Sequence, residues 1–318
     1  MSATTAPGPT PVPRGRSARR LEWPFLPPHL RAHVEQQLGS PVVGASSCTA
    51  GFTPGFASVL TCADGSRHFV KAASPVAQRA IAASYREEIR VLGHLPSPAP
   101  APRLLWSLDD DWVVLSTEHV DGQAPQRPWQ PTELAACLDT AAAMVAPLTP
   151  APSGLALEPF AAEFPDPALT WEHIRATRPD LGHLDEAADL AAGFAAVTAG
   201  DTLVHTDLRD DNLILGDGGR VWLCDWNWPV IGASWLDSLL LLIGPRGDGV
   251  DVDEVIASRP LLAGVPAEHV DRVLAMLAGH FLAQSDQPVP STSPHLRSFQ
   301  AWQGEVVWHW LAERRGWR

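Results

Sequence analysis

The stretch LVHTDLRDDNLIL, Leu203 to Leu215, places a short run of polar and charged residues between two apolar segments. A surface loop does not need apolar residues at both ends, and a core strand does not tolerate this many charges. The pattern therefore predicts a loop whose ends are buried. Its functional groups, among them His205, Asp207 and Asn212, should face one side of that loop.

Length and composition limit the class of protein. The chain has 318 residues, of which 45% are hydrophobic, enough for one large two-lobed domain or two small ones. Its longest apolar run, 235–244, is interrupted by Asp237 and Ser238 and is too short to cross a bilayer. The N-terminus lacks the apolar segment of a signal peptide. Four cysteines occur singly, without metal-site spacing, so we expect reduced cysteines in a cytoplasmic protein.

Charge separates the N-terminus from the rest of the chain. The net charge is −13, and the first twenty residues contribute four arginines and no acid, which leaves about −17 on the remainder. This acidic body argues against nucleic acid or a membrane as a partner. It would suit a cationic partner, although an acidic surface also serves solubility. We expect residues 1–20 to form a disordered, basic, proline-rich tail.

Lysine is nearly absent from the chain. Lysine and arginine together number 23, and Lys71, in HFVKAA, is the only lysine. A compact ammonium on a predicted strand matters where the planar arginine group cannot replace it. The alternative is that a single lysine survives by chance in an arginine-rich chain, and this observation alone does not separate the two.

The order of the predicted elements indicates an α+β protein with two lobes. Pro28 and Gly39 should begin and end a first helix. The hydrophobic pattern and turn residues predict strands over 42–48, 56–62, 67–72, 103–108 and 112–117, with one main helix over about 75–95. Later helices are expected over 131–145, 185–199, 233–243, 266–284 and 294–315. We therefore expect an N-terminal lobe over 21–118, a hinge over 119–130 and a helical lobe over 131–318 with a proline-rich insertion at 147–183.

Several short motifs follow one another along the chain in an order that indicates a common function. A glycine-containing turn joins two strands, Lys71 lies on the third strand, and HTDLRDDN precedes Asp225, thirteen residues after Asn212. The H-x-D-x-x-x-x-N pattern is weak alone and becomes specific with the strand lysine and Asp225. Over about residues 46–242, this arrangement resembles the aminoglycoside phosphotransferase and choline kinase branch of the protein-kinase-like superfamily.

The resemblance implies transfer of the γ-phosphoryl group of ATP to a hydroxyl group of a small molecule, with Mg²⁺. Asp207 occupies the position of the catalytic base, and Asn212 and Asp225 occupy the positions of the metal ligands. Each of the three alone could be a turn residue, because Asp and Asn favour turns. Their common register favours the catalytic interpretation.

Further residues follow from the same resemblance. Lys71 should bind the α- and β-phosphates, held by Glu88, or by Glu87 if the helix is rotated. Arg209 lies where protein kinases place a lysine near the γ-phosphate, although an exposed loop arginine is an equal alternative. His205 and the later Asp237 should brace the loop rather than take part in chemistry.

Nucleotide contacts are expected at two further segments. TAGFTPGFASVL has only Gly51 and Gly55 where protein kinases have three glycines, so its phosphate contacts stay open. In VVLSTEHVDG, the Glu118 carbonyl and the Val120 N–H would pair with adenine, with Thr117 behind the ring. An ordinary strand end is the alternative there. No P-loop motif occurs.

The acceptor site is the least defined part of the sequence. The acidic body predicts a negatively charged cleft and an amine-bearing acceptor, such as an antibiotic or metabolite, unless the acids serve solubility alone. Candidate acids come from the insertion and the C-terminal helices: Glu158, Glu163, Asp166, Glu172, Asp248, Asp251, Asp253 and Glu254. Those of 251–254 also suit a helix N-terminus. The tryptophans at 302, 308, 310 and 317 are expected in the core.

Two other functions compete with a small-molecule kinase. A protein kinase lacks support, because only about eleven residues separate Asp225 from Asp237, too few for an activation segment. A pseudokinase, binding nucleotide or a partner without turnover, is disfavoured because Lys71, Asp207, Asn212 and Asp225 are all present.

Overall fold

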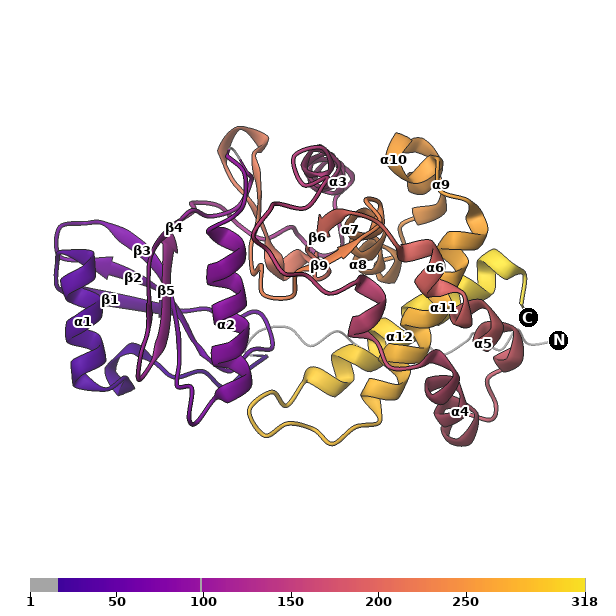
Figure 1. The fold of residues 1–318 in the computed structure, drawn as a ribbon, viewed down its shortest axis with the longest axis horizontal. Coiled ribbons are helices and arrows are strands. Elements are labelled where there is room, and N and C mark those ends of the chain that lie inside the picture. Colours follow the sequence, from indigo (N-terminus) through magenta and orange to yellow (C-terminus); the bar gives the residue numbers. More distant parts are fainter. Residues whose placement is uncertain (1–16, 98, 318) are drawn as a thin grey trace.

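The structure is a computed structural model that describes residues 17–97 and 99–317. It has two lobes, a sheet-containing N-terminal lobe and a helical C-terminal lobe, as Figure 1 shows. The predicted α+β fold class is confirmed. Within the described residues, no helix has both the length and the apolar composition needed to cross a membrane.

The N-terminal lobe is a five-stranded antiparallel sheet with the strand order β1-β2-β3-β5-β4. Its strands begin and end within one residue of the predicted bounds. The main helix is shorter than predicted, because the Ser74 hydroxyl accepts hydrogen bonds from the N–H groups of Val76 and Ala77 and forms a turn first. The elements of this lobe are α1 Pro28–Leu38, β1 Val42–Ser47, β2 Phe56–Cys62, β3 Arg67–Ala73, α2 Arg79–Leu92, β4 Leu104–Asp109 and β5 Val113–Glu118.

The sheet carries one helix on each face, with α1 on one side and α2 on the side of the C-terminal lobe (Figure 1). Leu30 and Val34 of α1 pack in one core with Val70 and Ala72 of β3. Successive side chains of a strand point to opposite faces. Lys71, between those two residues, therefore lies on the face that α2 covers.

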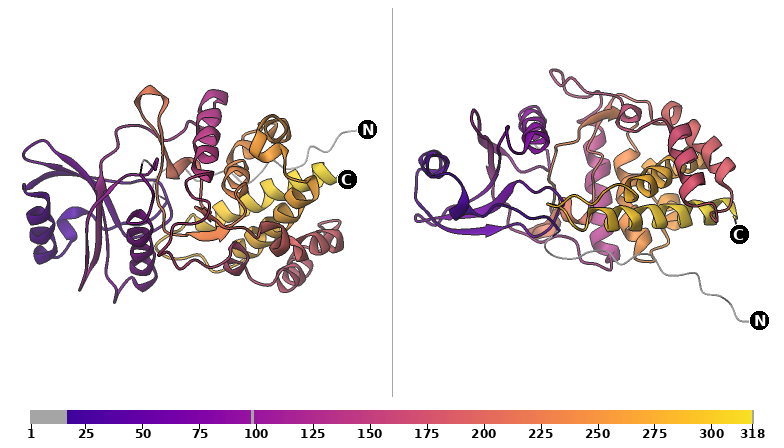
Figure 2. Two further views of the ribbon diagram at one scale, coloured as in Figure 1. Left: turned by 45° about the horizontal axis from the view of Figure 1, so that its top comes forward. Right: turned by 90° about the horizontal axis from the view of Figure 1, so that it is seen from below.

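The C-terminal lobe is built around one large apolar core. α11 packs along α12, side by side in Figures 1 and 2. The expected tryptophans belong to this core: Trp302, Trp308 and Trp310 are buried, and Trp317 packs against them partly buried. The helices of this lobe are α3 Pro131–Val145, α4 Pro167–Thr177, α5 Leu184–Ala192, α6 Phe194–Thr198, α7 Leu236–Leu241, α8 Ile243–Gly247, α9 Val252–Ser258, α10 Pro260–Ala263, α11 Ala267–Ser285 and α12 Leu296–Arg315.

Two predicted helices differ in the structure. The helix expected over 185–199 breaks at Gly193 into α5 and α6, where the Arg272 guanidinium lies within 2.6 Å of the place a Cβ would occupy. The helix expected over 233–243 begins only at Leu236 and is followed directly by α8. The proline-rich insertion at 147–183, for which no helix was predicted, contains α4, capped by the Asp166 side chain.

Two small strand pairs hold the polar loop identified from the sequence. β6, Thr202–Val204, pairs with β9, Val230–Gly232, and β7, Leu213–Leu215, pairs with β8, Val221–Leu223. The loop's apolar ends, Leu203 and Leu213, are each 1% exposed. The predicted loop with buried ends is confirmed, and β9 is a partner that the sequence did not indicate.

The N-terminal segment differs from the expected tail. Residues 1–16 lie outside the described residues. The Ser17 hydroxyl donates to the Gly51 carbonyl (2.5 Å), and the Arg19 N–H donates to the Thr292 carbonyl (2.8 Å). Arg20 donates to the Ala50 carbonyl (2.7 Å). Residues 17–20 therefore connect the β1–β2 loop to the C-terminal lobe instead of forming part of a free tail.

Candidate active site

The loop between β6 and β7 is held by hydrogen bonds to its backbone. Asp237, at the start of α7, accepts from the N–H groups of His205 and Thr206, both at 2.9 Å. The His205 Nε2 donates to the Cys224 carbonyl (2.8 Å), and the Asp207 N–H donates to its Nδ1 (3.3 Å). These bonds support Thr206 in a left-handed conformation, with φ of 69°. The predicted bracing by His205 and Asp237 is present.

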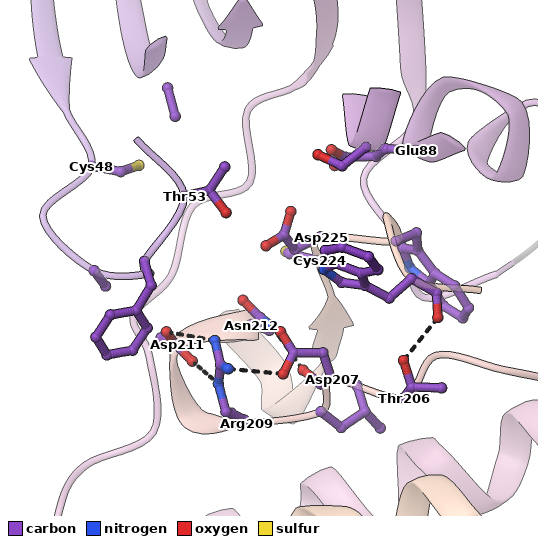
Figure 3. A pocket seen from close by; sticks show the side chains of 18 of the residues that line it. Cys48, Thr53, Glu88, Thr206, Asp207, Arg209, Asp211, Asn212, Cys224 and Asp225 are labelled. Carbon is purple, nitrogen blue, oxygen red and sulfur yellow. Dashed lines mark hydrogen bonds and ion pairs between the residues drawn. The ribbon is translucent and has the colours of Figure 1, made fainter. Parts of the chain in front are cut away.

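Asp207 and Asn212 contact each other across the loop. The Asn212 Nδ2 donates to the Asp207 carbonyl (2.8 Å) and to its Oδ2 (3.0 Å). This fixes the amide, whose oxygen accepts no hydrogen bond within the described residues. Asp225 follows β8 with φ of 68°, a conformation that ordinary side chains rarely adopt. In Figure 3 the three side chains face the same space, with Asp225 above Asn212 and Asp207.

Lys71 lies opposite this loop, between two carboxylates. Its Nζ is 2.9 and 2.7 Å from the two carboxylate oxygens of Glu88 and 2.5 Å from Asp225 Oδ1. Three oxygen contacts match the three N–H donors of an ammonium. Glu88 is buried, whereas Glu87 pairs with Arg90 (2.5 Å) on the same helix. Of the two acids that the sequence left as partners of Lys71, the structure brings Glu88 to it.

The charge states of Lys71 and Asp225 are set by their burial and by neighbouring charged groups. Burial alone would lower the pKa of Lys71, but the carboxylates of Asp225 and Glu88 offset burial and raise it. Burial would raise the pKa of Asp225, and Lys71 more than offsets this, so the pKa of Asp225 lies below its ordinary value. Lys71 is therefore a cation and Asp225 an anion near neutral pH.

Arg209 contacts the Asp207 carboxylate directly. One guanidinium nitrogen is 2.8 Å from Asp207 Oδ1, and another is 2.9 Å from Asp211 Oδ1, as Figure 3 shows. Burial raises the pKa of Asp207 to about 6, although Arg209 acts to lower it. The Asp207 side chain keeps 27% of its surface exposed, so a reacting group can approach it. Arg209 is therefore paired with two carboxylates and is not an exposed loop arginine.

One cavity of about 1020 Å³ joins these groups between the lobes. Ligand cavities commonly measure about 300–1,000 Å³, so this one lies at the upper end. Ten of the eleven predicted site residues line it, and the exception is Gly55. A Cβ at Gly55 would lie 2.3 Å from the Tyr85 hydroxyl, so this glycine permits packing against α2. The ten lining residues are Gly51, Lys71, Glu88, Thr117, Glu118, Val120, Asp207, Arg209, Asn212 and Asp225.

At the predicted adenine end, β5 stops as the chain leaves the sheet. Thr117, Glu118 and Val120 all line the cavity there. The Val120 N–H donates to no carbonyl within the part of the chain that the structure describes. A free backbone donor at the cavity wall is what a purine ring can pair with.

Most of the candidate acids for the acceptor site lie away from this cavity. Of the eight candidate acids, Glu163 alone lines the cavity. Asp166 caps α4, and Asp251 caps α9. Asp248 pairs with Arg127 (2.5 Å), and Asp253 accepts hydrogen bonds from Arg314 and Trp310. These acids stabilise helix ends and the core of the lobe, which explains their frequency in the sequence without a ligand.

Several lining residues carried no signal in the sequence. Phe52, in the β1–β2 loop, stacks on Phe299 of α12 with ring centroids 4.8 Å apart. The Ser293 hydroxyl donates to the Phe52 carbonyl (2.6 Å), and Arg20 lines the cavity beside Gly51. Segments far apart in the chain meet here, so no local spacing could have indicated them.

The sheet lobe, the helical lobe and the braced loop between them define a protein-kinase-like fold. No protein-family model matches the sequence, and comparison with curated proteins finds no match. Solved structures do match over most of the chain. An aminoglycoside phosphotransferase from Alicyclobacillus acidocaldarius has a TM-score of 0.55 and 15% identity, covering 93% of this chain and 97% of its own.

Two further structures give the same result. A spectinomycin phosphotransferase, solved with ADP and spectinomycin, has a TM-score of 0.59 and 10% identity and covers 88% of this chain and 96% of its own. A choline kinase from Streptococcus pneumoniae has a TM-score of 0.55 and 12% identity, covering 91% of this chain and 99% of its own. The resemblance expected from the motifs is confirmed in the fold, which is all that such low identities show.

Proposed function

We propose that the protein is an ATP-dependent phosphotransferase that transfers the γ-phosphoryl group to a hydroxyl group of a small molecule. The observation that carries this proposal is the meeting of Asp207, Asn212 and Asp225 in one cavity (Figure 3), which Lys71 also lines. Small-molecule kinases of the same fold, one of them solved with ADP, support it.

The residues present fit a magnesium ion. Within the described residues, no three His, Cys, Asp or Glu side chains cluster as a complete metal site. Mg²⁺ commonly takes one or two protein oxygens and completes its shell with phosphate and water. The unbonded oxygen of the Asn212 amide and the Asp225 carboxylate would provide those protein ligands. When bound, the ion would neutralise charge on the phosphates.

The remaining steps follow from the chain's own groups. Lys71 would exchange its contact with Asp225 for the α- and β-phosphates while Glu88 keeps it in place. The Asp207 carboxylate would accept the proton as the acceptor oxygen bonds to the γ-phosphorus and the bond to the bridging oxygen of ADP breaks. The Glu118 carbonyl and Val120 N–H would pair with adenine. Arg209 would provide positive charge near the γ-phosphate.

A second function has one observation in its favour. Arg209 contacts Asp207, and Lys71 contacts Asp225, so both ends of the reaction centre are internally paired. A protein that binds nucleotide or a partner without turnover would keep such pairs. We favour the kinase because Asp207 remains partly exposed.

The test is a screen for ADP formation with ATP or GTP and Mg²⁺ across hydroxyl compounds, with the phosphorylated product identified by mass spectrometry. We expect an acceptor-dependent rate that Asp207→Asn abolishes. Nucleotide binding by the protein with no acceptor-dependent rate would favour the second function.

A further inference from the structure

The acceptor end of the cavity is lined by one face from each of two packed helices. The α11 face consists of Leu277, His280, Phe281 and Gln284, which follow the i, i+3, i+4, i+7 spacing of one helical side. None of these four residues carries a charge at neutral pH, because burial lowers the pKa of His280 to about 4.

The second helix repeats this arrangement. The α12 face consists of Leu296, Phe299, Gln300 and Gln303, again at i, i+3, i+4 and i+7. Other charged residues of the two helices form ion pairs away from this face, such as Arg314 with Asp271 (2.6 Å). Arg297 does not line the cavity and donates hydrogen bonds to the side-chain oxygens of Gln284 (3.3 Å) and Gln300 (2.7 Å). Two uncharged helical faces therefore form a continuous wall of the cavity.

Aromatic side chains extend this wall toward the reaction centre. Phe164 meets His280 edge to face, with ring centroids 5.1 Å apart and planes at 88°. Trp228 also lines the cavity, and its carbonyl accepts a hydrogen bond from the hydroxyl of Thr206, the neighbour of Asp207 (2.8 Å). Trp228 is 54% exposed. A large exposed indole beside a reaction centre is a surface that an apolar ligand would cover.

Most charged groups that line the cavity form ion pairs near the reaction centre. Lys71 pairs with Glu88 and Asp225, and Arg209 pairs with Asp207 and Asp211. These groups also lie at the phosphate end, so they add no negative charge where the body of an acceptor would lie.

Glu163 is the exception on the acceptor side. It lines the cavity and takes part in no ion pair within the described residues. A single carboxylate can attract one cationic group, but a molecule with several ammonium groups would leave the others against a wall without carboxylates. Burying an unpaired charge is costly.

We infer that the acceptor is a largely apolar hydroxyl compound with no more than one cationic centre. This inference rests on the proposed function for the reaction and on the α11 and α12 faces for the chemistry of the ligand. The acidic body of the chain, which predicted an amine-bearing acceptor, contributes Glu163 to this part of the cavity.

The test measures binding separately from turnover. The protein is loaded with the non-hydrolysable analogue AMP-PNP and Mg²⁺, and three compounds are titrated calorimetrically. They are an uncharged macrolactone polyol, the same lactone carrying one amino sugar, and kanamycin, which carries several ammonium groups. We expect both lactones to bind at least about tenfold more tightly than kanamycin, and salt to weaken their binding by less than about twofold.

Kanamycin binding as tightly as the lactones, or no binding of either lactone, would overturn the inference. Lactone binding without ADP formation would contradict the proposed phosphoryl transfer and leave the inference about the ligand standing.

Substitutions test which residues of the wall contact the acceptor. Trp228→Ala should weaken lactone binding at least about tenfold while AMP-PNP affinity changes less than about twofold, because the indole is expected to cover the acceptor alone. Phe25→Ala is the matched control, since Phe25 is 73% exposed in the N-terminal lobe and does not line the cavity. Glu163→Gln should weaken only the lactone that carries the amino sugar. Unchanged lactone binding by Trp228→Ala would contradict the assigned wall.

Discussion

Asp207 is a single residue on which turnover should depend. Asp207→Asn keeps the shape of the side chain but cannot accept a proton, so we expect kcat to fall at least about 100-fold with little change in melting temperature. Asp217→Asn is the control, because Asp217 lies in the exposed turn between β7 and β8. Steady-state kinetics with the acceptor found by screening measures kcat for both variants and the wild type. A variant with near-normal turnover would remove Asp207 from the proton-accepting role.

The environment of Asp207 also predicts a pH dependence. Its pKa is raised to about 6, so below that pH the carboxyl is protonated and kcat/KM should fall about tenfold per pH unit. Burial is the largest cause of the shift, Asp211 and Asp225 act in the same direction, and Arg209 and His205 oppose it. Asp211→Asn should therefore move the inflection of the pH–rate profile to lower pH. An inflection that stays in place would show that another group controls the rate.

The same pKa sets the sign of a stability effect. A carboxyl whose pKa is higher in the folded protein than in the unfolded chain binds a proton more strongly when folded. Its contribution to the free energy of unfolding is therefore more favourable below the ordinary pKa and declines as pH rises through about 6. Asp207→Asn removes this dependence, so the variant should lose less stability between pH 4 and pH 6 than the wild type.

Among the elements, the β1–β2 loop depends on the N-terminal segment for its position. Arg20 donates to the Ala50 carbonyl, and Gly51, with φ of 78°, lies beside its guanidinium. Arg20→Ala should raise the KM for ATP about threefold or more, since a hydrogen bond to a charged donor is lost next to the phosphate-binding loop. Arg19→Ala is a matched control, because Arg19 contacts the C-terminal lobe through its backbone. Equal KM values for the two variants would contradict a role for this segment.

Across the whole molecule, nucleotide binding should require both lobes. Lys71 belongs to the sheet, whereas Asn212 and Asp225 belong to the helical lobe. We expect Mg²⁺ to increase ATP affinity in the wild type and to have no effect in Asn212→Ala or Asp225→Ala, because each variant lacks a hard oxygen ligand. Lys71→Ala should bind ATP weakly, and Lys71→Arg should not restore binding fully, because a planar group cannot contact three carboxylate oxygens as an ammonium does.

Calorimetric titration with ATP, with and without Mg²⁺, measures these effects, and EDTA treatment of the wild type is the control. Unchanged affinities in all of these variants would indicate that nucleotide binds elsewhere.

The sequence by itself determined the features that depend on neighbours in the chain. Helical spacing favoured Glu88 over Glu87 as the partner of Lys71, because this choice follows from backbone periodicity alone. The apolar ends of LVHTDLRDDNLIL predicted the buried anchors of the loop. These local rules also predicted the α+β class and the bounds of the sheet strands.

Contacts between distant segments were decided only by the tertiary structure. The stacking of Phe52 on Phe299 and the hydrogen bond from the Arg19 N–H to the Thr292 carbonyl join parts of the chain that no period relates. The acidic residues of the C-terminal lobe are a further case. Net charge counts them all, but a side chain that caps a helix or pairs with arginine no longer faces a ligand. Only packing decides which carboxylates remain in the cavity, and of the eight candidate acids for the acceptor site Glu163 alone lines it.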